Sequence, residues 1–145
     1  MIKIICVGKI KKAYITEFIN DYKKRISKFD NIKIFEVKDD SIKEEAKRII
    51  KYIDDKDFII TTQIEGKNLI SKQLAYLIDN TRTNGYSTIT FIIGGSNGLD
   101  TKIKMLSNYS LSFSSLTFPH GLFRGILLEQ IYRAFKIINN EPYNK

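Results

Sequence analysis

The sequence predicts an α/β fold: a single-domain, three-layer sandwich in which helices cover both faces of a parallel β-sheet. Short apolar, β-branched runs alternate along the chain with segments whose apolar residues recur at helical spacing. Strands that alternate with helices pair in parallel and are covered on both faces. No repeat, low-complexity tract or linker interrupts this alternation, so we expect one domain over residues 1–145.

The first half of the chain contains three expected strands and two expected helices. Each strand is an apolar, β-branched run, and the three cover residues 2–7, 32–37 and 58–62. The two helices show apolar residues at spacings of three and four, and they cover residues 15–29 and 42–53. Ser41 is the expected N-cap of the second helix, because Glu44 follows three residues later and completes a capping box.

The second half repeats the alternation and ends in a long helix. The expected elements are a helix around 74–78, a strand over 88–93, a short helix over 100–106, a strand over 109–113 and a helix over 120–138. Ser71 is the expected cap of the first of these helices, and the cluster 83–85 ends it. The last helix is apolar over more than one face, which predicts burial against more than its own sheet.

Composition excludes several classes of protein. The net charge of +8 favours an anionic partner, with nucleic acid ahead of a membrane surface. The longest apolar runs are too short to span a bilayer, and the N-terminus shows no signal-peptide cleavage site. One cysteine cannot form an internal disulfide, which favours the cytoplasm, and one cysteine with one histidine cannot build a zinc or haem site. We therefore expect no membrane and no metal.

The excess positive charge is concentrated near the N-terminus. Residues 1–30 carry eight cations and three acids, which is five of the eight net charges. Lys9, Lys11 and Lys12 directly follow the first strand, where loops of a parallel sheet point at ligands. A solvated surface explains any one lysine, but the concentration favours contact with RNA phosphates.

Glycines gather at the end of the expected strand 88–93. Gly94, Gly95 and Gly98 fit neither a phosphate loop, which needs a following lysine, nor a dinucleotide loop, which needs another spacing. Open parallel sheets bind ligands outside the carboxyl ends of their strands. The loops at those ends are 61–63, 94–96 and 113–120, so we expect a ligand site among them.

Four motifs occur in the order found in one known family: residues 92–98 (IIGGSNG), 111–114 (LSFS), 117–120 (TFPH) and 128–136 (LEQIYRAFK). With the opening 7–9 and a turn at 64–67, the sequence resembles the ribosomal RNA large subunit methyltransferase H family, small members of the SPOUT superfamily. The resemblance implies a C-terminal trefoil knot, a homodimer and S-adenosyl-L-methionine (SAM) as methyl donor. It also implies methylation at N3 of a pseudouridine in 23S rRNA of the assembled ribosome.

The resemblance also assigns residues. It implies that the cofactor is bound by Thr62, Gly94, Phe113, Ser114, Ser115, Leu116, Thr117 and Phe118. Position 62 departs from the family, where leucine is usual, so the role of this threonine side chain is open. SAM carries no phosphate, which agrees with a glycine loop that lacks lysine.

Three residues near the C-terminus are the expected catalytic residues. Arg133 lies in the matching motif Tyr-Arg-Ala, although an intrahelical ion pair with Glu129 explains it as well. Family members end in Tyr-His-Lys or Tyr-His-Arg, so Tyr143 and Lys145 match, whereas Asn144 replaces the histidine. An amide can orient a base but cannot accept a proton near neutral pH. His120, at a helix start, is expected to be a cap or hinge rather than a base.

Two other functions stay open at this point. The protein could be a ribosome-binding or RNA-binding factor of the same fold that is weakly active or inactive. It could also be a small-molecule α/β enzyme whose charge reflects a lysine-rich composition. Methyl transfer to ribosomes would distinguish an active enzyme from an inactive RNA-binding factor. Strong salt dependence of RNA binding would argue against a small-molecule enzyme.

Overall fold

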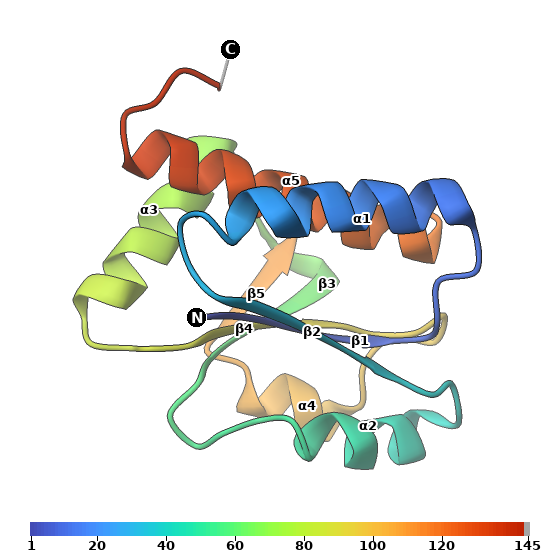
Figure 1. Ribbon diagram of the computed structural model, residues 1–145. Helices are drawn as coiled ribbons and strands as arrows, with labels where there is room; N and C mark the ends of the chain where they lie inside the picture. The colour runs from blue at the N-terminus through green and yellow to red at the C-terminus, as the bar shows by residue number, and fades with distance from the viewer. Residues whose placement is uncertain (144–145) are drawn as a thin grey trace.

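The computed structural model describes residues 1–143, which form a five-stranded parallel sheet covered by helices on both faces (Figure 1). The strands lie in the order β2-β1-β4-β3-β5. Their bounds are β1 Ile2–Val7, β2 Ile32–Val37, β3 Phe58–Asn68, β4 Ile89–Ile93 and β5 Tyr109–Ser112. The helices are α1 Ala13–Ile26, α2 Ile42–Ile50, α3 Ser71–Thr83, α4 Thr101–Leu106 and α5 His120–Ile138.

The helices form two unequal layers. Figure 1 shows α1, α3 and α5 on one face of the sheet and α2 and α4 on the other. Helix α5 packs against both α1 and α3, and its residues Leu127, Ile131 and Phe135 are fully buried in the larger core. The smaller core, around Ile5 and Ile92, lies under α2 and α4. The predicted α/β sandwich with a parallel sheet is confirmed.

Most predicted elements are present with small shifts at their ends. Strand β2 and helix α5 have the predicted bounds, whereas α1 and α2 end before Phe29 and Ile53. Ser41 caps α2 as expected, since its hydroxyl accepts a hydrogen bond from the Glu44 amide at 3.3 Å. Ser71 is not a cap: it is the first residue of α3, and its hydroxyl donates to Gln130 at 2.7 Å.

The largest departure is in β3. We expected a strand over 58–62 and a turn at 64–67, but β3 continues to Asn68. Its pairing with β5 shifts register between Thr62 and Lys67, so the polar residues between them bulge without ending the strand. Gly66 permits this second contact, because a Cβ there would lie 2.8 Å from the Leu111 backbone.

The sheet buries one complete ion pair. Lys3 Nζ lies 2.8 Å from Asp57 Oδ2 and also donates to the Tyr52 carbonyl, while Asp57 accepts from Thr90. Every partner is satisfied, so this cluster is structural. Within residues 1–143, no helix combines the length and apolar character that a membrane span requires. The trefoil knot stays a prediction.

Candidate functional site

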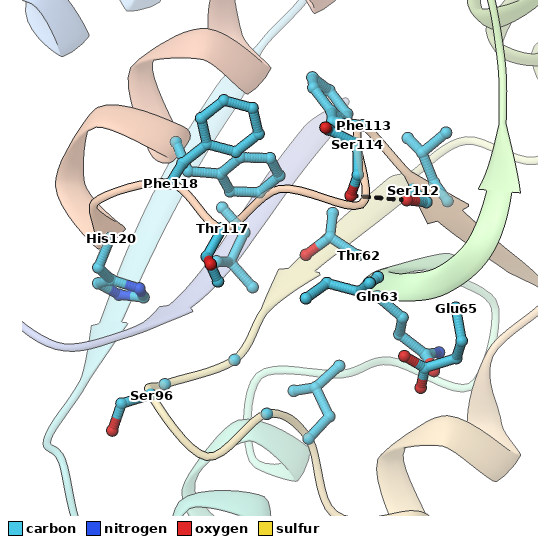
Figure 2. A pocket seen from close by; sticks show the side chains of 18 of the residues that line it. Thr62, Gln63, Glu65, Ser96, Ser112, Phe113, Ser114, Thr117, Phe118 and His120 are labelled. Atoms are coloured by element: carbon cyan, nitrogen blue, oxygen red, sulfur yellow. Dashed lines mark hydrogen bonds between the residues drawn. The ribbon is translucent and has the colours of Figure 1, made fainter.

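A cavity of about 590 Å³ opens beside the middle of β3 and at the carboxyl ends of β4 and β5 (Figure 2). The loops 94–96 and 113–120 contribute to it, as expected for a parallel sheet. Residues 61–63 are not a loop, because β3 continues past them, but Thr62 and Gln63 still line the cavity. Its lining includes seven of the eight residues that the resemblance assigns to cofactor binding: Thr62, Gly94, Phe113, Ser114, Leu116, Thr117 and Phe118. Ser115 lies in the same loop but does not line the cavity.

The floor of the cavity is a glycine loop folded back on itself. Gly95 and Gly98 form an isolated bridge, and Gly98 has a φ of +81°. A Cβ added to Gly94 would lie 2.8 Å from the Gly98 carbonyl oxygen and 3.0 Å from the Leu99 side chain. Glycine is therefore required at position 94 by close approach of the backbone, which leaves main-chain groups accessible to a ligand.

The Thr62 side chain has a structural partner. Its hydroxyl donates a 3.0 Å hydrogen bond to the Ile92 carbonyl and so links the middle of β3 to β4. Beside it, the Gln63 amide donates to Thr61 and Ser110 at 2.7 and 3.1 Å. The threonine at a position where the resemblance expects leucine thus tethers two strands at the cavity edge.

Phenylalanines form one wall. The rings of Phe113 and Phe123 meet edge to face at 5.0 Å, and Phe118 stacks on Phe123 at 5.9 Å. Leu116 is 73% exposed, which leaves its apolar side chain uncovered at the cavity. The loop is held by its own serines, since Ser114 accepts from the Leu116 amide at 3.0 Å. This wall offers apolar cover to a flat ligand.

One ion pair lies among the lining residues. Lys104 Nζ is 3.1 Å from Glu65 Oε1, and both side chains are well exposed. A hydrogen bond with the Glu65 backbone, and then Lys104, hold the pKa of the Glu65 carboxyl below its usual value. The pair places one charge of each sign at the cavity.

The start of α5 is tied to the end of β1. His120 lines the cavity, and its Nε2 hydrogen-bonds the Val7 carbonyl. Its side chain does not cap α5, whose N-cap is Pro119, and a hinge role for His120 stays a prediction. One turn later, Arg124 donates to the Gly8 carbonyl at 3.0 Å and to Glu36 at 2.5 Å. The loop after β1 is therefore anchored beside the cavity.

The predicted RNA-contact lysines lie on that anchored loop. Lys9, Lys11 and Lys12 are all exposed, and their side chains extend from the segment between β1 and α1. His120 and Arg124 hydrogen-bond the Val7 and Gly8 carbonyls, so this segment is tied to the start of α5 directly before Lys9.

A second group of side chains, which we call the Tyr143 cluster, lies on α1, on α5 and on the segment that follows α5. The Tyr143 hydroxyl donates to Glu129 at 3.0 Å and lies 3.1 Å from the Tyr22 hydroxyl. Arg133 pairs with Glu129 at 3.0 Å and sits 4.8 Å from the centre of the Tyr143 ring. Tyr132 packs edge to face on the same ring. Burial, and then the hydrogen bonds with Tyr22 and Glu129, raise the pKa of Tyr143.

The structure does not bring this cluster to the cavity. None of its described residues lines the cavity, and Glu129 lies nine residues along α5 from His120, about 14 Å at 1.5 Å per residue. Lys136 pairs with Glu141 at 2.7 Å, and its Nζ lies 5.8 Å from the centre of the Tyr132 ring at the edge of the cluster. Asn144 and Lys145 lie outside the described residues.

Comparison with known proteins identifies the family. A family model described as "Predicted SPOUT methyltransferase" matches residues 1–144. The chain belongs to this family. It is 46% identical over 99% of its length to "Ribosomal RNA large subunit methyltransferase H" of Clostridium botulinum, and that match covers 99% of the relative. It is 48% identical, with the same coverage, to a Methanococcus maripaludis protein provisionally given that name.

Solved structures agree on the fold. The chain is similar to a probable methylase family protein from Haemophilus influenzae Rd KW20, with a TM-score of 0.55 and 15% identity. It is also similar to the SpoU methyltransferase AviRb from Streptomyces viridochromogenes, with a TM-score of 0.51 and 11% identity. These matches cover 96% and 97% of this SPOUT family chain but only 66% and 61% of the solved chains.

Several lining residues were not assigned from the sequence. Glu65 falls in the polar stretch of β3 that resembles a turn, and Lys104 lies on the short helix α4. The position of Glu65 after a buried strand, where a second pairing with β5 begins, is the signal that could have found it. Phe123 gave no such signal, because an aromatic residue on a long apolar helix is typical of a core position.

Proposed function

We propose that this protein is a SAM-dependent methyltransferase that modifies N3 of a pseudouridine in 23S rRNA of the assembled ribosome, in the cytoplasm. One observation carries the proposal: the Gly94 loop and the 113–118 loop meet at one cavity, in a chain at least 46% identical to relatives named for large-subunit rRNA methylation. The excess of basic residues fits an RNA substrate.

The residues present fit SAM. A cavity of about 590 Å³ lies in the size range of small-molecule sites, which are mostly apolar with a few polar groups. The absence of a side chain at Gly94 leaves backbone groups free to hydrogen-bond adenine, and Phe113, Leu116 and Phe118 give it apolar cover. Glu65 and Lys104 supply one charge of each sign for the amino-acid end of the ligand. No phosphate-binding lysine is needed.

The chemistry asks mainly for placement. SAM, when bound, supplies a methyl group on a good leaving group, so that an N3–CH₃ bond forms as the S–CH₃ bond breaks and the N3 proton leaves to water. The chain's part is to hold the nucleobase edge in line with that methyl group and to exclude competing orientations. The phenylalanine wall and the Gly94 loop fix one side of this alignment.

We also propose that the protein acts as a homodimer in which α5 takes part in the interface. Arg133 and Tyr143, with Lys145 outside the described residues, are the proposed substrate-orienting residues, yet the first two lie apart from the cavity of their own chain. A second copy that presents its Tyr143 cluster to the cavity resolves this separation. Isologous dimers repeat such a contact twice.

The test is methyl transfer to ribosomes. Radiolabelled SAM is incubated with the protein and ribosomes from a strain that lacks the endogenous enzyme, and 23S rRNA is isolated and digested. We expect label in a single N3-methylated pseudouridine, and none with the Gly94→Val variant. Binding of ribosomes and SAM without transfer would instead support the inactive RNA-binding factor. Transfer only to small molecules, without salt-dependent RNA binding, would support the small-molecule enzyme.

A further inference from the structure

Arg124 is a buried cation that packing alone does not explain. Its side chain is 1% exposed, and its Nε has no hydrogen-bond partner among the described residues. Its ionic partner within residues 1–143, Glu36, is 38% exposed, so part of the carboxylate charge is already stabilised by water. Burying a charged arginine in such a pair often stabilises a protein no more than an apolar side chain of similar volume at the same position.

The contrast with Lys3 supports this reading. Lys3 and Asp57 are both buried, and Asp57 accepts further hydrogen bonds from Thr90 and the Asp54 amide. That pair is fully satisfied and lies within the sheet. Arg124 is only partly satisfied, but it sits at the boundary between a helix and a basic loop.

The Arg124–Glu36 pair holds the loop between β1 and α1 at two points, and the start of α5 holds it at a third. Arg124 binds the Gly8 carbonyl at 3.0 Å, and Glu36 Oε2 accepts from the Ile10 amide at 3.3 Å. The Ile10 side chain then packs on the α5 backbone, because a Cβ on Gly121 would lie 2.9 Å from it. The loop is thus fixed before it reaches Lys11.

The same helix start continues the cavity wall. Residues 113–119 lead directly into His120, which lines the cavity and hydrogen-bonds the Val7 carbonyl. Gly8 has a φ of +96°, and a Cβ there would lie 3.2 Å from Asp39 and 3.4 Å from His120. The junction therefore leaves little freedom between the cavity and the loop.

We propose that Arg124 and Glu36 are positioning residues that hold the loop carrying Lys9, Lys11 and Lys12 against the cavity, so that these lysines contact RNA phosphates where the substrate base must enter. This inference rests on the proposed function. It assigns a substrate role to two residues that touch neither the cavity nor the RNA themselves. The positioning acts on substrate affinity and leaves the cavity unchanged.

The first variant is Arg124→Met, which keeps side-chain volume and leaves Glu36 free to be hydrated. We expect unchanged or higher thermal stability, unchanged SAM affinity, a turnover number within about twofold of wild type, and a KM for ribosomes raised about tenfold. Glu36→Ala should raise the ribosome KM likewise but lower thermal stability, because it leaves the buried Arg124 cation without its ionic partner. Glu36→Gln, which keeps an acceptor for Arg124 and the Ile10 amide, should have a ribosome KM closer to wild type. Glu44→Ala, which breaks an exposed pair with Lys47 on α2, is the matched control.

A double-mutant cycle tests the mechanism. Lys11→Ala/Lys12→Ala should itself raise the ribosome KM, and Arg124→Met should add at most about twofold on that background because both act through one loop. On a Lys23→Ala/Lys24→Ala background, Arg124→Met should still raise the ribosome KM by its full factor of about ten. Equal effects on both backgrounds would overturn the proposal.

Hydrogen exchange separates this inference from the proposed function. Amides of residues 8–12 should exchange faster in Arg124→Met whether or not the protein methylates RNA. Unchanged exchange, or faster exchange with an unchanged ribosome KM in the folded variant, would refute the positioning role. Failure of the wild type to bind SAM or label ribosomes would refute the proposed function instead.

Discussion

The Tyr143 hydroxyl donates a 3.0 Å hydrogen bond to Glu129, which ties the C-terminal segment to the middle of α5. Tyr143→Phe removes this bond and the contact with Tyr22 while it keeps the ring beside Arg133. We expect a loss of about 1 kcal/mol in unfolding free energy and a fall of about tenfold in single-turnover methyl transfer. Tyr76→Phe, on the exposed side of α3, is the control. A wild-type rate in Tyr143→Phe would remove the hydroxyl from the substrate-orienting role.

The separation of the Tyr143 cluster from the cavity predicts complementation between protomers. Gly94→Val should damage the cavity and Arg133→Ala the cluster, so each pure variant should be inactive. If the active unit combines the cavity of one copy with the cluster of another, mixed and reassociated variants should regain about a quarter of wild-type activity. Sedimentation at micromolar concentration should give a species of twice 16.8 kDa. If mixed dimers form but methyl-transfer activity does not return, the cavity and the Tyr143 cluster act within one chain.

Close backbone approach at Gly94 predicts loss of cofactor binding when a side chain is added. The Cβ of Gly94→Val would overlap the Gly98 carbonyl at 2.8 Å and push the loop outward. We expect calorimetry to show SAM affinity at least about tenfold weaker, with a folded circular-dichroism spectrum. Gly85→Asn is the control, because no atom lies within 4 Å of the missing Cβ of Gly85, and asparagine tolerates the positive φ of that residue. Unchanged affinity in folded Gly94→Val would move the cofactor elsewhere.

Asn144 replaces the histidine that the family resemblance leads one to expect, and it lies outside the described residues. We expect orientation of the nucleobase to be the role of that position, so Asn144→His should change single-turnover methylation of ribosomes little between pH 6 and 9. A gain of about a hundredfold that follows a histidine titration would mean that the position acts as a general base.

The Cys6 thiol is buried in β1 and donates to the Phe35 carbonyl at 3.4 Å. Burial raises its pKa to about 12, from a reference value of 9.0. A raised pKa contributes stability that is complete below about pH 9 and is lost as pH rises toward 12. The native protein should therefore resist thiol reagents at pH 8 until it unfolds. The difference in unfolding free energy between wild type and Cys6→Ala should shrink over that alkaline range, and rapid native labelling would contradict the burial.

Elements with strong local periodicity could be predicted from the sequence. The alternation in Ile32–Val37 and the long stripe of His120–Ile138 specify type and bounds without distant partners. The continuation of β3 through Gly66 could not be predicted, because it depends on pairing with β5 more than forty residues later. A polar stretch that contains a glycine is typical of a turn in the local sequence. It forms a strand here only because it pairs with β5.

Some residues of the candidate site could be predicted from the sequence, whereas the placement of others could not. Gly94 and the 113–118 loop carried motifs, so their convergence followed from the rule for parallel sheets. Arg133 and Tyr143 also carried motifs, but their distance from the cavity is a tertiary fact that no spacing encodes. Arg124 was visible only as one more cation on a helix, since neither its burial nor its contact with Gly8 leaves a local pattern.

The position of α5 between α1 and α3 also constrains how the molecule is made. Helices α1 and α5 share the larger core, so the apolar side of α1 is covered only when Ile131 and Phe135 of α5 are in place. A chain that stops before α5 leaves the apolar side of α1 uncovered, so it should be recognised by chaperones or degraded.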